Sequence, residues 1–255
     1  MPINLELRKA WETEWHKRRG EADEYKHHGS DTIIEPAPEG YLRLYYLTTP
    51  EHAISNIVFK RIKISRFSEL NDPFELLAVN MKGPKFRDQF SNLIENFKEK
   101  KGLICLSENW MDPVLWSHYA AKHKGVALGF KVKQNLVRVV SYSDKRLNKK
   151  EIEDIKSESK TISDALVYTK FSSWKYENEW RLLCDLDDFG KESSLYFKPM
   201  DESFQLEEVI LGALCDLNLE KMRSLVSQHH SSAITYKAQL AKQSFRILAD
   251  EVTVP

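Results

Sequence analysis

The segment Trp174-Lys-Tyr-Glu-Asn-Glu-Trp-Arg181 places two carboxylates, Glu177 and Glu179, two residues apart at the start of an apolar stretch, residues 180–186. The apolar stretch predicts a buried strand, and strand alternation places both carboxylates on one face. A carboxylate buried among aromatic and apolar side chains is costly unless a cation pairs with it or it acts on a substrate. Arg181 or Lys175 can supply that cation, so a strand-edge salt bridge and a functional pair are both open.

The composition of the 255 residues indicates a globular protein. Hydrophobic residues make up 42% of the chain and aromatic residues 11%, which is enough for a core and argues against disorder over most of the sequence. The 38 basic residues balance the 38 acidic ones. This balance does not indicate a broad basic face for duplex DNA, but it allows a local groove for a nucleotide or a short nucleic acid.

The three cysteines and the lack of long apolar runs indicate the compartment. Cys105, Cys184 and Cys215 are far apart in apolar contexts, which is typical of reduced core thiols rather than of a disulfide framework or a zinc site. No apolar run approaches the roughly 20 residues of a membrane span, and the N-terminus lacks the apolar core of a signal peptide. We therefore expect a cytoplasmic protein that does not associate with membranes.

The N-terminal residues predict a separate helical extension. Apolar residues recur every fourth position in the first 28 or so residues, at Ile3, Leu7, Trp11 and Trp15, which predicts an amphipathic helix. We expect the two tryptophans to be buried against the domain or, alternatively, against a second copy in a homodimer. Residues 29–40, with two prolines, predict a linker. The chain is thus divided into residues 1–40, helix and linker, and residues 41–255, a single α+β domain.

Short strands with unevenly spaced helices are predicted over the remaining chain. Pro50 and Pro113 fall in predicted first helical turns, and Asp112 is the expected N-cap of the second helix. The uneven alternation favours an α+β fold over a doubly wound sheet. Strands are expected at residues 42–47, 62–65, 102–107, 126–130, 180–186, 194–198, 208–212, 233–238 and 244–249, and helices at residues 50–59, 84–100, 112–122 and 147–163.

Four segments place polar side chains among apolar ones and are candidates for one site: residues 44–48, 65–75, 105–125 and 177–179. Each also has an ordinary explanation. Asn71-Asp72-Pro73 is a strong turn signal, with Asp72 bonded to its own backbone, and Trp116 suits core packing. His118 and His123 are five residues apart, so they do not share a helical face as zinc ligands would. We predict no metal centre from these histidines.

Long motifs in these segments resemble a bacterial family. Phe67-Ser-Glu-Leu-Asn-Asp-Pro-Phe-Glu75, the run from Leu115 to Phe130 that begins Leu-Trp-Ser-His-Tyr-Ala, and Trp174 to Arg181 together look like domain of unknown function 2971. The resemblance covers roughly residues 41–215 and leaves the N-terminal helix outside. The family name implies no activity.

The order of elements is also similar to the ADP-ribosyltransferase fold, a split β-sheet flanked by helices that binds NAD in a cleft. On this resemblance, Tyr46 and Thr48 take the places of a signature His and Ser on the opening strand. Tyr119 corresponds to a Tyr on a helix, and Glu179 to the catalytic Glu. Glu177 completes a Glu-x-Glu pair like that of the arginine-modifying branch. A tyrosine in place of the His is the chief departure from the family pattern.

The resemblance implies NAD as a substrate. Glu179 would stabilise the oxocarbenium character that develops when the nicotinamide–ribose bond breaks. An aromatic side chain, Tyr119 or Trp116, would stack on the nicotinamide, and hydroxyl and amide groups would orient the ribose and diphosphate. The candidates for the latter are Thr48, Ser107 and Asn71. We expect Tyr46, Ser107, Tyr119 and Glu179 to face one concave site, with Asn71 at its rim.

The resemblance implies transfer of ADP-ribose to a macromolecule, protein or nucleic acid, as in bacterial toxins and phage-defence effectors of this fold. Two alternatives come from the residues. A Mg²⁺-dependent nuclease would use clustered carboxylates as metal ligands, with Lys175 nearby; these are Asp72, Glu75, Glu177 and Glu179. A non-catalytic nucleotide-sensing module would use the same cleft, and the missing His supports it.

Overall fold

The computed structural model describes residues 36–78, 94–148, 162–250 and 253. The expected N-terminal helix, with Trp11 and Trp15, lies outside the described residues, and so does any dimer contact that it makes. Most of the helices expected at residues 84–100 and 147–163 also lie outside, although residues 94–100 are helical. The predicted division of the chain at residue 40 therefore stays a prediction.

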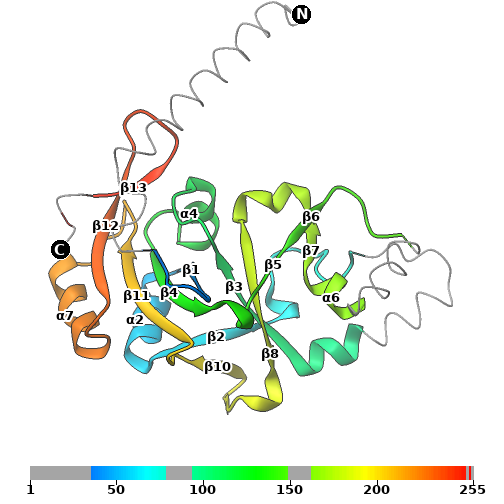
Figure 1. Ribbon diagram of the computed structural model, residues 1–255. Coiled ribbons are helices and arrows are strands. Elements are labelled where there is room, and N and C mark those ends of the chain that lie inside the picture. The colour runs from blue at the N-terminus through cyan, green and yellow to red at the C-terminus, as the bar shows by residue number, and fades with distance from the viewer. Residues whose placement is uncertain (1–35, 79–93, 149–161, 251–252, 254–255) are drawn as a thin grey trace, which may run out of the picture.

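The described part is an α+β fold built on a mixed sheet of eleven strands (Figure 1). Strands β11 and β12 are parallel, and the other pairs of this sheet are antiparallel. The main path runs β13 (Ile247–Ala249), β12 (Ile234–Leu240), β11 (Phe204–Leu211), β4 (Val126–Lys133), β1 (Tyr41–Thr48), β3 (Lys101–Ser107), β2 (Arg61–Arg66), β10 (Leu195–Pro199) and β9 (Lys191–Glu192), while β8 (Glu179–Asp185) joins β3 to β5 (Arg138–Val139). Strands β6 (Ser141–Ser143) and β7 (Thr169–Phe171) form a separate parallel pair.

Helices cover both faces of the sheet. Leu44 of β1 packs in one core cluster with side chains of α2 (Pro50–Phe59) and α7 (Leu219–His229). The next residue, Tyr45, packs in another cluster with Trp116 of α4 (Pro113–Tyr119). Because successive strand residues point to opposite faces, α2 and α7 lie on one face and α4 on the other (Figure 1). A third cluster contains residues of α6 (Ile162–Val167).

The sheet is forked at β3. One edge of β3 pairs with β8 along its full length, from Lys101 to Ser107. The other edge is shared between two strands: β2 pairs at residues 102–103, and β1 pairs only where Tyr45 faces Ser107. In the described part of the chain, no strand pairs with residues 104–106 on that second edge. The sheet therefore opens between β1 and β2, and this opening positions the site described below.

Two differences from the predicted elements have clear local causes. Helix α4 ends at Tyr119, three residues early, because Ala121, Lys122 and His123 have φ of 46°, 56° and 69°. This left-handed backbone cannot continue a right-handed helix. Strands β5, β6, β7 and β9 were not predicted, because two or three residues are too short to show a period.

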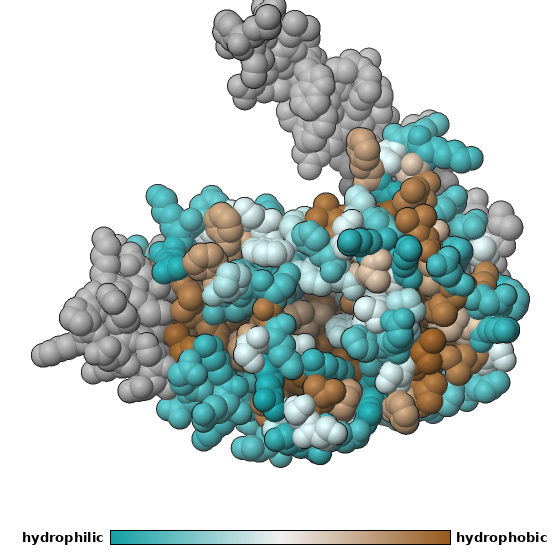
Figure 2. Space-filling model, turned by 180° about the vertical axis from the view of Figure 1, so that it is seen from behind, coloured by the Kyte–Doolittle hydropathy of each residue, from teal (hydrophilic) through white to brown (hydrophobic). Residues whose placement is uncertain are grey.

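The three cysteines are free thiols, as predicted, and Cys184 and Cys215 are buried. Within the described ranges, no helix has both the length and the apolar character needed to cross a bilayer. From behind, hydrophobic residues gather in several patches separated by hydrophilic ones, and the surface is hollowed near its centre (Figure 2).

Candidate functional site

A pocket of about 360 Å³ lies where the sheet opens between β1 and β2, beside the end of β3. Residues 45–47 of β1 and 105–107 of β3 line it, together with side chains from the loop after β2 and from α4. We call it the Tyr119 pocket. Six of the eight residues proposed for an NAD site line it: Tyr46, Asn71, Ser107, Tyr119, Glu177 and Glu179.

The other two residues proposed for an NAD site lie elsewhere. Trp116 is fully buried, and its Nε1 donates to the backbone oxygen of Trp110 at 2.5 Å. Its side chain packs from α4 onto the strands of the sheet as a core residue, so it is not available to stack on a ligand in this pocket. Thr48 is 5% exposed at the end of β1 and does not line the pocket. The ordinary explanation of Trp116 is therefore confirmed.

Glu177 and Glu179 do converge, but not through strand alternation. Strand β8 begins at Glu179, whereas Glu177 ends a 3₁₀ helix, Ser172–Glu177. Between them, Asn178 adopts a left-handed φ of 42°, which turns the chain. The two carboxylates meet at Lys170, whose Nζ donates to Glu177 Oε2 at 2.6 Å and to Glu179 Oε2 at 3.1 Å. Both glutamates are less than 5% exposed.

Arg181 extends this cluster to a third carboxylate. Its guanidinium is fully buried and donates to Glu179 from Nε at 2.8 Å and from Nη2 at 3.0 Å. It also makes a bidentate pair with Glu75, at 2.6 and 2.9 Å. Lys170 Nζ lies 3.7 Å from Glu75 Oε1. Arg181 was predicted as a partner, whereas Lys170 was not; Lys175 is exposed and forms no ion pair with these carboxylates within the described residues.

The two neighbouring carboxyl groups have opposite pKa shifts. Burial alone would raise the pKa of Glu179, but Arg181 and Lys170 beside it lower that pKa to about 2. For Glu177, burial raises the pKa, and the charge of Glu179 raises it further against the opposing effect of Lys170. One group is thus a fixed anion at neutral pH, while the other is shifted toward taking up a proton.

Tyr119 and Asn71 connect the carboxylates to the mouth of the pocket. The Tyr119 hydroxyl donates to Glu177 Oε1 and accepts from Asn71 Nδ2 at 2.7 Å. Burial and the adjacent Glu177 charge raise the pKa of Tyr119, so its hydroxyl keeps its proton and remains a donor. Asn71 is exposed and lies at the rim.

The other two β-strand candidates have more limited roles. The Ser107 hydroxyl donates to the backbone oxygen of Glu177 at 2.6 Å and accepts from the Asn109 backbone at 3.0 Å. Ser107 therefore holds the segment that carries Glu177. Tyr46 lines the pocket where the strands separate, and burial raises the pKa of its hydroxyl to about 12.

An aromatic group at the pocket was not predicted as a unit. His118 lines the pocket, and its Nδ1 lies 2.8 Å from the Tyr176 hydroxyl. Its ring centroid is 6.0 Å from Tyr119 and 6.4 Å from Trp174. Lys170 Nζ lies 5.0 Å from the centroid of Trp174. The alternating Trp174 and Tyr176 before Glu177 were the available sequence signal, but only the 3₁₀ turn brings both against α4.

The carboxylates proposed as Mg²⁺ ligands are engaged by protein donors. Asp72 Oδ1 accepts from the Phe74 backbone at 2.9 Å, which confirms the turn expected there. Glu75, Glu177 and Glu179 accept from Lys170 and Arg181, as described above. In the residues that the structure describes, no group of three or more His, Cys, Asp or Glu is arranged to hold a metal ion.

Comparison with protein-family models matches residues 115–182 to a family described as a protein of unknown function, DUF2971. This supports the family resemblance over that range, which contains Tyr119, Lys170 and both glutamates of the pair. Comparisons with curated proteins and with solved structures give no match.

Proposed function

We propose that the Tyr119 pocket is an active site that cleaves the nicotinamide–ribose bond of NAD and transfers ADP-ribose to a macromolecular acceptor. The observation that carries this proposal is the bridged carboxyl pair. Glu179 has a pKa of about 2 and the neighbouring Glu177 has a raised pKa. Two carboxyl groups with pKa values pushed apart in one pocket are typical of a site where one stabilises charge and the other moves a proton.

The charge of the cluster supports this chemistry. Three carboxylates and two cations leave one negative charge when all are ionised. Breaking the glycosidic bond develops positive charge on the ribose, and a fixed anion in a buried pocket stabilises it without reorganisation. Because Arg181 holds the carboxylate of Glu179 in place, that carboxylate is preorganised to stabilise the ribose charge.

The place and the size of the pocket also support NAD. The pocket lies where the sheet opens between β1 and β2 along one edge of β3, and the resemblance to the ADP-ribosyltransferase fold implies a cleft of this kind. Its volume of about 360 Å³ falls within the usual range for small-molecule sites. We assign the nicotinamide and its ribose to this pocket, with the ring near Tyr119 and the ribose hydroxyls near Tyr46.

The proposed reaction has two steps, cleavage of the nicotinamide–ribose bond and attack on the resulting ribosyl cation. The bond between ribose C1′ and the pyridinium nitrogen breaks, and its electron pair neutralises the ring as nicotinamide leaves. Glu179 stabilises the resulting ribosyl cation. A nucleophile of the acceptor bonds to C1′ and loses its proton to Glu177, whose raised pKa suits proton uptake. Water in place of the acceptor would give hydrolysis.

The test is to incubate the purified full chain with NAD and to measure nicotinamide release and NAD binding. Release that exceeds the rate of the buffer blank, with ADP-ribose found on an acceptor or as free ADP-ribose, supports the proposal. Binding of NAD without release contradicts it and indicates a sensor. Mg²⁺-dependent cleavage of nucleic acid without nicotinamide release contradicts it and indicates a nuclease.

A further inference from the structure

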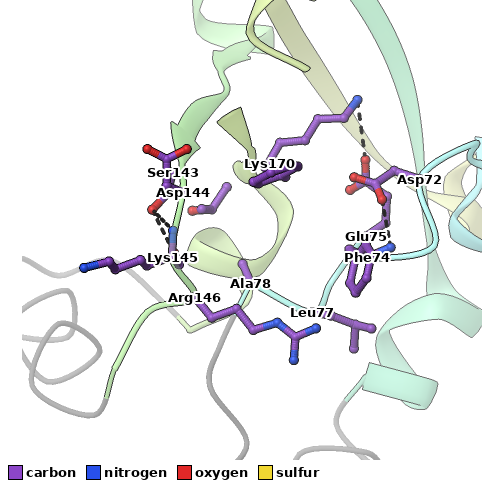
Figure 3. Close-up of a pocket in the computed structure, with 12 residues that line it drawn as sticks. Asp72, Phe74, Glu75, Leu77, Ala78, Ser143, Asp144, Lys145, Arg146 and Lys170 are labelled. Atoms are coloured by element: carbon purple, nitrogen blue, oxygen red, sulfur yellow. Dashed lines mark hydrogen bonds and ion pairs between the residues drawn. The ribbon is translucent and has the colours of Figure 1, made fainter. Parts of the chain in front are cut away.

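A second cavity, of about 250 Å³, shares Lys170 and Glu75 with the Tyr119 pocket. We call it the Phe74 pocket. Figure 3 shows Phe74 and Leu77 on one side, Lys145 and Arg146 near the opposite strand, and Lys170 reaching across toward Glu75. The proposed NAD chemistry does not use this cavity.

The walls of the Phe74 pocket expose two large aromatic side chains. Phe74 is 57% exposed and Phe171 is 49% exposed, and both line the cavity with Leu77 and Ala78. Exposed phenylalanines that gather around a cavity are unusual on a protein surface. Such a group marks a binding site more often than a single exposed phenylalanine does. A planar ring suits such walls because it gains stacking contact with an aromatic face.

Two of the three cations that line this cavity, Lys145 and Arg146, have no ionic partner in the described residues, whereas the third, Lys170, is paired with glutamates. Neither Lys145 nor Arg146 forms a salt bridge there, and the Arg146 guanidinium lies 5.4 Å from the centre of the Phe74 ring. An anionic group of a ligand is the natural partner for two such cations, and a phosphate accepts from both lysine and arginine.

The acidic side chains of the cavity add a third requirement. Glu75 is neutralised by Arg181. Asp72 accepts a backbone N–H from Phe74, and Asp144 accepts from the Ser172 hydroxyl. Both aspartates keep acceptor capacity, because each carboxylate has about four lone-pair sites. A ligand that also offers N–H donors satisfies them.

We propose that the Phe74 pocket binds a nucleotide unit, in which an aromatic base with N–H donors contacts the phenylalanines and aspartates and the phosphate contacts Lys145 and Arg146. The unit comes either from a free mononucleotide or from a single-stranded nucleic acid. Aromatic side chains beside cations are the arrangement that holds such units. The proposal stands independently of NAD cleavage in the neighbouring pocket.

The test is calorimetric titration of the full chain with guanosine 5′-monophosphate, ribose 5-phosphate and a single-stranded hexanucleotide. We expect the mononucleotide to bind at least about tenfold more tightly than ribose 5-phosphate, because stacking of one base contributes about that factor. A hexanucleotide that binds at least about tenfold more tightly than the mononucleotide identifies a strand as the source. Equal affinities identify the free nucleotide. Absence of binding by both nucleotide probes overturns the proposal.

Matched variants test whether the nucleotide binds in this cavity. Phe171→Ala and Phe74→Ala should each weaken binding about tenfold, whereas Phe245→Ala, at a residue that is 98% exposed and outside the cavity, should not. Lys145→Ala should weaken binding and Lys242→Ala, also exposed and outside the cavity, should not. Circular dichroism confirms the fold of each variant. Nucleotide binding that all three cavity variants leave unchanged overturns the assignment.

Discussion

Lys170→Met should destabilise the protein strongly, because it removes the cation that joins three buried carboxylates. The Lys170 side chain is 4% exposed, and its Nζ lies 2.6, 3.1 and 3.7 Å from Glu177, Glu179 and Glu75. Methionine keeps much of the volume but none of the charge. The cluster then holds three carboxylates and only Arg181, so its net charge changes from one negative charge to two.

Removing one partner of a buried ion network costs about 3–5 kcal/mol, because the remaining charges stay buried without compensation. For a protein of this size, each kcal/mol lowers the melting temperature by about 2–4 °C. We therefore expect a decrease of about 6–20 °C at pH 7. The matched control is Lys98→Met, whose ion pair with Glu95 at 3.1 Å is exposed, and which should cost about 0–1 kcal/mol.

The contribution of Glu177 to this loss can be isolated with a double-mutant cycle. Glu177→Gln removes a carboxylate that Lys170→Met leaves unpaired, so the double variant should be more stable than the sum of the single effects by about 1–3 kcal/mol. Urea unfolding at pH 7 measures each term. The reasoning is refuted if Lys170→Met costs no more than Lys98→Met, or if the coupling is below about 0.5 kcal/mol.

Three further predictions follow from single contacts. Tyr119→Phe removes the hydrogen bond that lowers the pKa of Glu177. Transfer of ADP-ribose to the acceptor should therefore fall about tenfold, the effect of one hydrogen bond to a charged group, and the acid limb of the pH profile for transfer should move to higher pH. Glu179 has a lowered pKa of about 2, so its ionised form stabilises the folded protein by about 3 kcal/mol. This stabilisation should be present above pH ~4.5 and lost as the pH falls toward 2. In urea unfolding, the difference in unfolding free energy between the unmodified chain and Glu179→Gln should narrow over that range. Gly129→Ala would place a Cβ 2.8 Å from the buried Glu208 carboxylate and should lower the unfolding free energy by about 1–3 kcal/mol. The control is Gly190→Ala, whose added Cβ meets nothing within 4 Å. It should change the unfolding free energy by less than about 0.5 kcal/mol.

Most elements could be predicted from the sequence because their signals are local. Proline after a capping residue marks the starts of α2 and α4, with Thr49 and Asp112 as caps, and apolar runs mark β3 and β4. The fork at β3 could not be derived from periodicity, since a strand's own residues do not say that two other strands share one of its edges. The split sheet was expected only from a resemblance.

The acidic residues of the candidate site could be predicted from the sequence, but its principal cation, Lys170, could not. Glu177 and Glu179 stand out because carboxylates flanked by Trp and Tyr are unusual. Their shared face was predicted from strand alternation, which is wrong for Glu177 because it lies in a 3₁₀ helix. Lys170 lies in a strand of three residues, where one lysine beside a Phe carries no signal of burial. Only the pairing of β7 with β6, together with the following 3₁₀ helix, brings it beneath both carboxylates.

The most direct test of the proposed active site compares nicotinamide release from NAD by the unmodified chain, Glu179→Gln and Glu177→Gln, with circular dichroism to confirm folding. We predict that Glu179→Gln lowers turnover by about 10²-fold or more, with most of the NAD affinity kept, because the charge that stabilises the ribosyl cation is lost. Glu177→Gln should affect NAD cleavage less and transfer to the acceptor more. A folded Glu179→Gln protein that releases nicotinamide at the unmodified rate would contradict the account.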